Sequence, residues 1–263
     1  MKPEIEVLEE TEYSIKFILR NASVALANSF RRAMKSLVPT LAVDYVDIYV
    51  NTSYFYDEII AHRLAMIPIK TNLEKFNFQS ECSCGGEGCP NCQVSFRLNV
   101  EGPKVVYSGD FVSDDPETHF AFDNIPVVEL YKDQQLMVEA VARLGTGKEH
   151  AKFQPVSVCA YKIIPKIEVE NCNGCGDCVE ACPRRVLELK DGRVEVVNEL
   201  DCSFCQECEK VCESRAIRVV ETDRFLFTVE STGALPLRTV MRKALEILVE
   251  KAEKMNEILA EIQ

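Results

Sequence analysis

The chain has 263 residues, of which 47% are hydrophobic and 27% are charged. This is the composition of an ordinary globular protein of two or three domains. A formal net charge of −12 opposes attraction to nucleic-acid phosphates and argues against direct sequence-specific nucleic-acid binding as the main function. No apolar run approaches the roughly 20 residues of a membrane helix, and the N-terminus lacks a secretory signal. We therefore expect a cytoplasmic protein that does not bind membranes.

The N-terminal segment predicts a hairpin followed by a helix. Residues 13–19 alternate between apolar and polar side chains, as in a strand with one buried face, and residues 4–8 are its expected partner. After Asn21, the expected N-cap, apolar residues recur at helical spacing until Pro39 ends the pattern. These positions are Leu26, Phe30, Ala33 and Leu37.

The middle of the chain predicts a mixed sheet domain. A strand is expected over 43–50, and residues 56–69 predict a short helix that enters a strand. Four further strand-like segments, at 94–100, 104–111, 137–144 and 156–164, are separated by Gly, Pro and Asp. Cys159 lies in the last of these and is expected to be a small buried strand residue.

The C-terminal segment predicts a strand over 224–232 and then a long helix, with Pro236 in its first turn. The helix carries an apolar heptad seam, spaced 4, 3, 4, 3, 4 and 3 residues, at Met241, Leu245, Leu248, Ala252, Met255, Leu259 and Ile262. Such a seam either completes the core of its own chain or packs on a helix of a partner, and its terminal position favours a partner.

Two cysteine runs repeat the same spacing, C-x2-C-x2-C-x3-C, 30 residues apart. The first run is Cys172, Cys175, Cys178 and Cys182, and the second is Cys202, Cys205, Cys208 and Cys212. In a cytoplasmic chain, clustered thiols indicate metal binding rather than disulfides. This spacing is that of two-cluster ferredoxins, so the sequence predicts two 4Fe-4S clusters, with zinc or disulfides as the alternatives.

The last cysteine of each run is expected to cross to the other cluster, as it does in two-cluster ferredoxins. One cluster is then held by Cys172, Cys175, Cys178 and Cys212, and the other by Cys202, Cys205, Cys208 and Cys182. Each run should end in a short helix that carries the crossing cysteine. Ser203 and Phe204 replace the residues that match Asn173 and Gly174, which predicts a looser or more exposed second half without loss of a ligand.

A separate cysteine loop, CSCGGEGCPNC, contains Cys82, Cys84, Cys89 and Cys92. Four thiolates joined by a glycine-rich turn predict a structural zinc site. The alternative is a loop of reduced thiols without a metal.

Three flanking segments resemble the D-type subunits of archaeal RNA polymerase, a family that is similar to the third-largest subunit of RNA polymerase II and to bacterial alpha. They are NSFRRAMKSLVPTLAVDYVDI at 28–48, DEIIAHRLAMIPI at 57–69 and FTVESTGALP at 227–236, together with the cysteine loop. The resemblance covers essentially the whole chain. It implies an α+β protein with a split dimerisation domain (1–40 and 222–263), an inserted α+β domain (41–165) and a ferredoxin-like domain (166–221).

The resemblance also implies partners. The dimerisation domain would pair with subunit L, and the dimer would recruit the two large catalytic subunits of DNA-directed RNA polymerase, a nucleotidyltransferase complex. The helices at 22–38 and 241–262 are the expected dimer surface. Its expected anchors are Phe30, Leu37, Leu245, Leu248 and Met255.

Arg31 and Arg32 match the basic pair of the family, and His62 and Arg63 lie in its AHR segment. We expect contacts with other subunits at these positions. The alternatives are solvated arginines for the pair and a purely structural role for His62.

No catalytic centre is predicted in this chain. Nucleotidyl transfer uses clustered carboxylates that hold two magnesium ions, and the tight aspartate pair Asp114–Asp115 is typical of a solvated turn. The leading hypothesis is therefore a non-catalytic polymerase assembly subunit whose clusters are structural or regulatory. The competing hypothesis is a ferredoxin-like electron carrier or a subunit of a redox enzyme, which explains the two cysteine runs but not the flanking segments.

Overall fold

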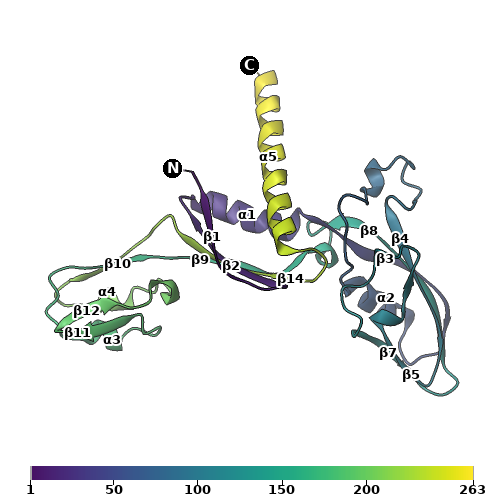
Figure 1. The fold of residues 1–263 in the computed structure, drawn as a ribbon, viewed down its shortest axis with the longest axis horizontal. Coiled ribbons are helices and arrows are strands. Elements are labelled where there is room, and N and C mark those ends of the chain that lie inside the picture. Colours follow the sequence, from purple (N-terminus) through teal and green to yellow (C-terminus); the bar gives the residue numbers. More distant parts are fainter. Residues whose placement is uncertain (1, 263) are drawn as a thin grey trace. The chain divides into compact units, whose positions relative to one another are not determined.

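A computed structural model describes residues 2–262. The fold is α+β, as predicted (Figure 1). The chain divides into two compact units. One unit comprises the N-terminal part up to Arg31 together with Cys159–Val229, and the other comprises Arg32–Val158 and the C-terminal part from Glu230.

The helices are α1 (Val24–Ser36), α2 (Asp57–Met66), α3 (Asp177–Glu180), α4 (Glu207–Lys210) and α5 (Leu237–Glu261). The strands are β1 (Glu4–Glu10), β2 (Ser14–Arg20), β3 (Pro39–Asn51), β4 (Gln93–Glu101), β5 (Lys104–Tyr107), β6 (Val112–Ser113), β7 (Pro126–Leu130), β8 (Gln135–Thr146), β9 (Val156–Ile163), β10 (Lys166–Val169), β11 (Leu187–Lys190), β12 (Arg193–Val196), β13 (Ile217–Val220) and β14 (Phe225–Ser231).

The first unit is built on a sheet that joins the two ends of the chain. The predicted hairpin is present as antiparallel β1 and β2, and the strand order is β1-β2-β14-β9. Because side chains alternate along a strand, Phe17 and Phe227 face one side, where Phe30 of α1 packs on them. The rings of Phe17 and Phe227 are stacked with their centroids 4.9 Å apart. Ile18 and Leu226 point to the opposite side of the sheet.

Helix α1 begins two residues later than its predicted cap implies. The Ser23 side chain accepts a hydrogen bond of 3.1 Å from the Leu26 N–H and so caps the helix. Asn21 has a φ of 54° and its side-chain amide donates to the Lys2 carbonyl. The prediction of Asn21 as N-cap is therefore wrong, because the chain still turns at Asn21 before the helix starts.

In the same unit, residues 166–221 form what we call the cluster module. Its strands pair as β10–β13 and β11–β12, and its two short helices are α3 and α4 (Figure 1). Each of these helices carries the third cysteine of its run, Cys178 or Cys208, and ends shortly before the fourth. The crossing cysteines thus follow the helices rather than lying in them.

The second unit contains a four-stranded sheet of order β3-β8-β4-β6 and a two-stranded sheet, β5–β7. Ile60 and Leu64 of α2 are fully buried in the core of this unit, where the rings of Phe96 and Phe120 stack at 4.5 Å. The strand predicted after α2 is reduced to a single bridge between Ile69 and Phe120. Strands β6 and β7 lack clear alternation and were not predicted.

Helix α5 has the predicted position and length, but Pro236 is its N-cap rather than part of the first turn. Only its first two turns contribute buried residues, which are Leu237, Val240, Met241 and Ala244. No helix among residues 2–262 is long and apolar enough to cross a membrane. The predicted division into a split dimerisation domain and two inserted domains stays a prediction.

The aromatic contact on the sheet generates a test of the fold. Phe227 is fully buried and touches Phe17, Phe30 and Tyr161. Replacing Phe227 with Ala should destabilise this unit by about 3–5 kcal/mol, because it removes a buried ring and leaves a cavity. Native-state hydrogen exchange of the β2 and β14 amides measures the loss. The control Ile5→Ala, at a 43% exposed position of β1, should change the exchange of these amides little. Equal acceleration of exchange in the two variants would contradict the assignment of Phe227 to the core.

Candidate iron–sulfur, metal and partner sites

The structure brings together the first predicted ligand set, which consists of Cys172, Cys175, Cys178 and Cys212. Burial raises the pKa of Cys178, and negative charge on Cys212, Cys175 and Cys172 raises it further. Cys212 comes from the other run, and it lies near enough to influence Cys178 of the first run. The Cys212 sulfur accepts a 3.2 Å hydrogen bond from the Ala216 N–H, and such donors stabilise a thiolate.

The second ligand set, Cys182, Cys202, Cys205 and Cys208, lines one small cavity together with Val186 and Val219. Burial raises the pKa of Cys208 to about 11, with further contributions from charge on Cys182, Cys202 and Cys205. Cys182, which belongs to the first run, thus shares this cavity with three cysteines of the second run. Thiols that oppose one another's ionisation can become thiolates together only beside a positive charge, which iron supplies in ferredoxin modules.

The two runs share an unusual backbone. Gly174 and Gly176 have φ values of 75° and 90°, and the matching Phe204 and Gln206 have φ values of 57° and 62°. At Gly174 the conformation and the space both require glycine, since a Cβ would lie 2.3 Å from the Gly192 carbonyl oxygen. In the second run, side-chain-bearing residues adopt the left-handed region, at roughly 1–2 kcal/mol each. The second half therefore repeats the left-handed turns of the first half at residues that carry side chains, and the expectation of a looser or more exposed second half stays a prediction.

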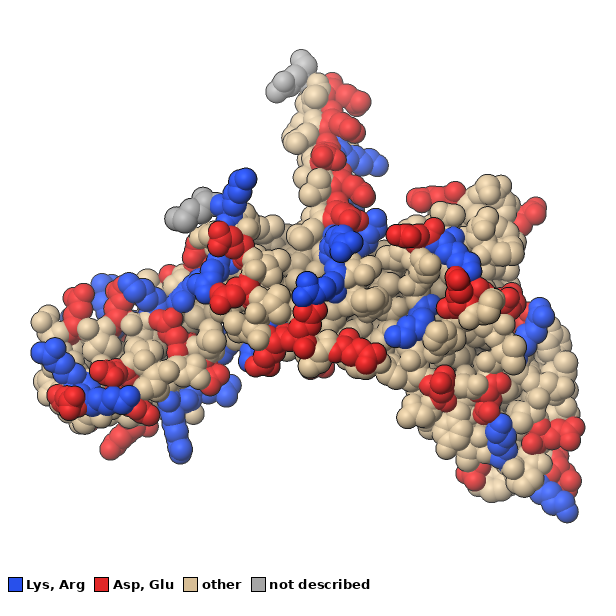
Figure 2. All heavy atoms as spheres, in the orientation of Figure 1, with Lys and Arg blue, Asp and Glu red and all other residues tan. Residues whose placement is uncertain are grey.

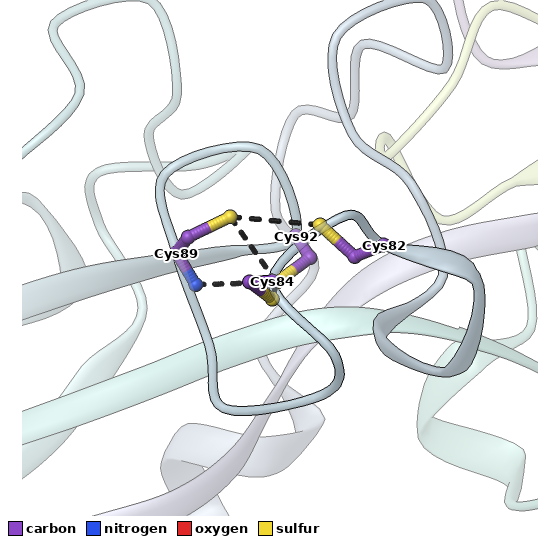
Figure 3. Close-up of side chains that lie close together, drawn as sticks. All are labelled: Cys82, Cys84, Cys89 and Cys92. Atoms are coloured by element: carbon purple, nitrogen blue, oxygen red, sulfur yellow. Dashed lines mark hydrogen bonds between the residues drawn. The ribbon is translucent and has the colours of Figure 1, made fainter.

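The cysteine loop places four sulfurs within 4.8 Å of one another (Figure 3). The Sγ–Sγ distances are 3.5 Å for Cys82–Cys89, 3.7 Å for Cys84–Cys92 and 3.9 Å for Cys89–Cys92. A zinc tetrahedron with Zn–S bonds of about 2.3 Å has S–S edges of about 3.8 Å. The donor set and its spacing therefore fit a closed tetrahedral metal site.

The electrostatics of the cysteine loop also favour a cation. Backbone N–H groups of Gly86 and Gly88 lower the pKa of Cys84 to about 6, whereas burial raises the pKa of Cys92 to about 12. Neighbouring sulfurs contribute to both values. Four thiols this close cannot all ionise in isolation, and a divalent ion removes that repulsion.

The predicted dimer anchors divide into two groups. Phe30 is 1% exposed and packs on Phe17 and Phe227, so it belongs to the core of its own unit and offers no contact surface. Leu37 and Leu248 are half-buried, while Leu245 and Met255 are 40% and 58% exposed. Figure 2 shows acidic side chains along one edge of α5 and uncharged side chains along the other. The helix is thus amphipathic over its exposed length.

The basic residues expected to contact other subunits differ in their surroundings. Arg31 donates twice to the Asn28 side chain within α1, at 3.2 and 3.0 Å. Arg63 donates to the Pro126 carbonyl and lies over the Phe55 ring. Arg32 and His62 are exposed. Arg31 and Arg63 therefore have structural contacts in their own units.

The aspartate pair at 114–115 holds a turn. Asp114 accepts a hydrogen bond from the Ser95 N–H, and Asp115 forms an ion pair of 2.8 Å with Lys75. Hydrogen bonds from Lys75 and Thr118 lower the pKa of Asp115. Both carboxylates thus have structural partners, in line with the predicted turn; Asp114 is exposed as expected, whereas Asp115 is half-buried.

Sequence reasoning missed the residues that join the cluster module to the sheet. Lys162 of β9 donates to the Cys202 carbonyl at 3.3 Å, and Arg224 forms an ion pair of 2.8 Å with Glu199. Leu200 packs on an apolar cluster of the sheet. No spacing or motif marks these residues, because the contacts join segments that are distant in sequence.

Two family models match the chain. The model described as the RNA polymerase Rpb3/RpoA insert domain matches residues 46–165, and that of the 4Fe-4S dicluster domain matches residues 171–217. The second match covers all eight cysteines of the two runs and identifies an iron–sulfur module.

Curated relatives extend over essentially the full chain. A protein of Archaeoglobus fulgidus named DNA-directed RNA polymerase subunit Rpo3 is 74% identical, with 100% of both chains covered. Proteins with the same name from Methanosarcina acetivorans and Pyrococcus horikoshii are 43% and 39% identical, with coverage of 100% and 97% of each chain. Identity at this level and coverage shows that the chain belongs to the Rpo3 subunit family of archaeal DNA-directed RNA polymerases.

Proposed function

We propose that this chain is a non-catalytic assembly subunit of DNA-directed RNA polymerase, which heterodimerises with subunit L and then recruits the two large catalytic subunits. Membership in the Rpo3 family supports a role in the polymerase. The observation that carries the assembly role is the apolar seam of α5, defined as Leu245, Leu248, Ala252, Met255, Leu259 and Ile262. Met255, Leu259 and Ile262 are 58%, 53% and 76% exposed.

An exposed seam of this kind is unfavourable in water. Burying a large aliphatic side chain contributes about 1.5–3 kcal/mol, so association with a partner helix that covers the seam is favourable. Its heptad spacing matches knobs-into-holes packing, and the acidic edge keeps the helix oriented with the seam toward the partner. An obligate dimer interface of this class buries roughly 2,000 Å² or more.

The iron–sulfur module is proposed to bind two 4Fe-4S clusters. Cys172, Cys175, Cys178 and Cys212 would hold the first cluster, and Cys182, Cys202, Cys205 and Cys208 the second. The proximity of each crossing cysteine to the other run supports this assignment. The clusters are structural or redox-regulatory, since thiolates gather only around a metal and cluster binding is therefore linked to folding of the module.

The cysteine loop is proposed to bind one structural zinc ion through Cys82, Cys84, Cys89 and Cys92. The sulfur distances support a tetrahedral site, and four protein ligands leave no open position for catalysis. Zinc would tie the loop to β4, which begins at Gln93, directly after the last ligand.

Several finer features complete the proposal. Exposed Arg32 and His62 are suited to contacts with other subunits, whereas Arg31 and Arg63 support their own surroundings. The domain division 1–40 plus 222–263, 41–165 and 166–221 is retained, supported by the extents of the two family matches. The protein is proposed to work in the cytoplasm.

The seam of α5 yields a test of partner binding. The double variant Leu245→Glu, Met255→Glu should weaken binding to subunit L by about 100-fold or more, because it buries carboxylates in an apolar interface. Co-purification and titration calorimetry measure the affinity. The control Glu253→Gln, on the same exposed stretch but outside the seam, should bind normally. Unchanged binding of the double variant would show that the seam is not the interface.

The ligand assignment yields a second test. Serine at either exposed cysteine, Cys175 or Cys205, should reduce iron from about eight to about four atoms per chain. Each variant should impair recruitment of the large subunits while leaving the dimer with subunit L intact. Iron analysis and anaerobic pull-down measure the two effects.

Cys159→Ser is the control for the cluster variants and should keep full iron content. Normal recruitment by chains that have lost iron would contradict a role of the clusters in assembly. Fast electron exchange with reduced ferredoxin, in the absence of any polymerase subunit, would favour the electron-carrier hypothesis.

The zinc proposal is tested by elemental analysis of the anaerobically purified chain. We expect about one zinc ion per chain, lost in Cys92→Ser and retained in the neighbouring control Ser83→Ala. Cobalt substitution should produce the intense thiolate-to-metal absorption of a tetrahedral sulfur site. Equal zinc content in Cys92→Ser and in the unaltered chain would exclude this loop as the site.

A further inference from the structure

The second cysteine run is attached to the sheet through an apolar contact. Leu200 shortly precedes this run and packs on Ile18 of β2, Leu226 of β14 and Ile164, with Leu8 of β1 beside them. Ile18 and Leu226 lie on the side of the sheet opposite Phe17 and Phe227. Helix α1 therefore covers one side of the sheet, and the cluster module touches the other.

Polar contacts reinforce this attachment. Arg224 forms an ion pair of 2.8 Å with Glu199, and the two side chains are only 26% and 30% exposed. The same guanidinium donates to the Pro165 carbonyl. Lys162 donates to the carbonyl of Cys202 at 3.3 Å. The ion pair and the Lys162 hydrogen bond thus converge on residues 199–202, which end in the first cysteine of the second run.

The first run is held differently. The 30-residue repeat aligns 199–202 with 169–172, and the latter segment makes its contacts inside the cluster module. Val169 pairs with Ile217 of β13, and the Glu170 N–H donates to the Ala216 carbonyl. Cys172 lies beside Arg193 and Val194 of β12. The two runs therefore have the same cysteine spacing, but the segment before the second run contacts the sheet and the segment before the first run contacts the module itself.

The backbone strengthens this asymmetry. The first run adopts its left-handed turns with Gly174 and Gly176, whereas the second run does so with Phe204 and Gln206. For a residue with a side chain that conformation costs free energy, and the strain persists only where other interactions enforce it. Ligation by Cys202, Cys205 and Cys208 is such an interaction. The second run is thus the one expected to relax when its cluster is lost.

We propose that the cluster held by Cys182, Cys202, Cys205 and Cys208 controls the order of the sheet, while the other cluster acts only within the module. This inference rests on the proposed two-cluster function and assigns a different role to each cluster. When the second cluster is lost, residues 202–206 relax, Glu199 and Leu200 leave Arg224 and the apolar cluster, and β2 and β14 become less protected. Glu199, Leu200, Lys162 and Arg224 are positioning residues in this mechanism.

The test compares matched variants of the full chain, purified anaerobically. Cys175 and Cys205 occupy equivalent exposed positions of the two runs, so Cys175→Ser and Cys205→Ser remove equivalent ligands of different clusters. Iron content is measured first, followed by hydrogen exchange of the peptides that contain Ile18 and Leu226. We expect about tenfold faster exchange of these peptides in Cys205→Ser and unchanged exchange in Cys175→Ser.

A second pair of variants tests the route. Arg224→Gln should accelerate exchange of the same peptides without lowering iron content, and combining it with Cys205→Ser should add nothing further, because both changes break one connection. Glu168→Gln, which removes an exposed ion pair with Lys166 inside the module, is the control and should leave the sheet unchanged.

The possible results distinguish failure of this inference from failure of the proposed two-cluster function. Full iron content in Cys205→Ser would refute the two-cluster assignment and, with it, this inference. Reduced iron in both cysteine variants with equal exchange of the sheet would refute the inference alone. Additive effects of Arg224→Gln and Cys205→Ser would likewise overturn the proposed route.

Discussion

The structure of the first unit depends on one long-range pairing, in which β14 lies beside β2 although about 200 residues separate them in sequence. Neither the N-terminal hairpin nor β14 can bury an apolar face alone. Together they provide one side for Phe30 of α1 and another for Leu200 of the cluster module. Closing so long a loop costs conformational entropy, and the stacked Phe17 and Phe227 rings contribute to offsetting it.

Sulfur–metal chemistry is the second constraint on the molecule. The cluster module and the cysteine loop both bring thiols close enough to oppose one another's ionisation. A bound cation would remove this repulsion and stabilise both segments, in keeping with the function proposed above. The two regions differ in geometry, because a tetrahedral zinc site needs sulfurs about 4 Å apart, whereas a cubane is ligated at more widely spaced corners. The spacing seen in the cysteine loop matches only the former.

In this member of the Rpo3 family, the ferredoxin-like module is not a separate electron carrier but is attached to another part of the same chain. The second cysteine run of the module is attached to the sheet of the first unit through Leu200, Glu199 and the Cys202 carbonyl. Such contacts between the second cysteine run and the sheet are compatible with a cluster that stabilises the surrounding structure. The exposed seam of α5 offers a separate surface, formed by the helix alone.

The sequence by itself determined the eight-cysteine duplication, the cysteine loop and the heptad seam of α5, because each depends on local spacing or periodicity, while the α+β class followed from the resemblance of the flanking segments. It could not place Phe30 in the core, since an apolar position on an amphipathic helix suits a core and an interface equally well. It also misplaced the cap of α1, which Ser23 provides. Only the tertiary structure revealed that Glu199, Leu200, Lys162 and Arg224 join the second run to the sheet. These contacts connect segments that meet only after the β2–β14 pairing forms, so no local sequence pattern predicts them. The cysteine repeat also makes the two runs look equivalent in sequence.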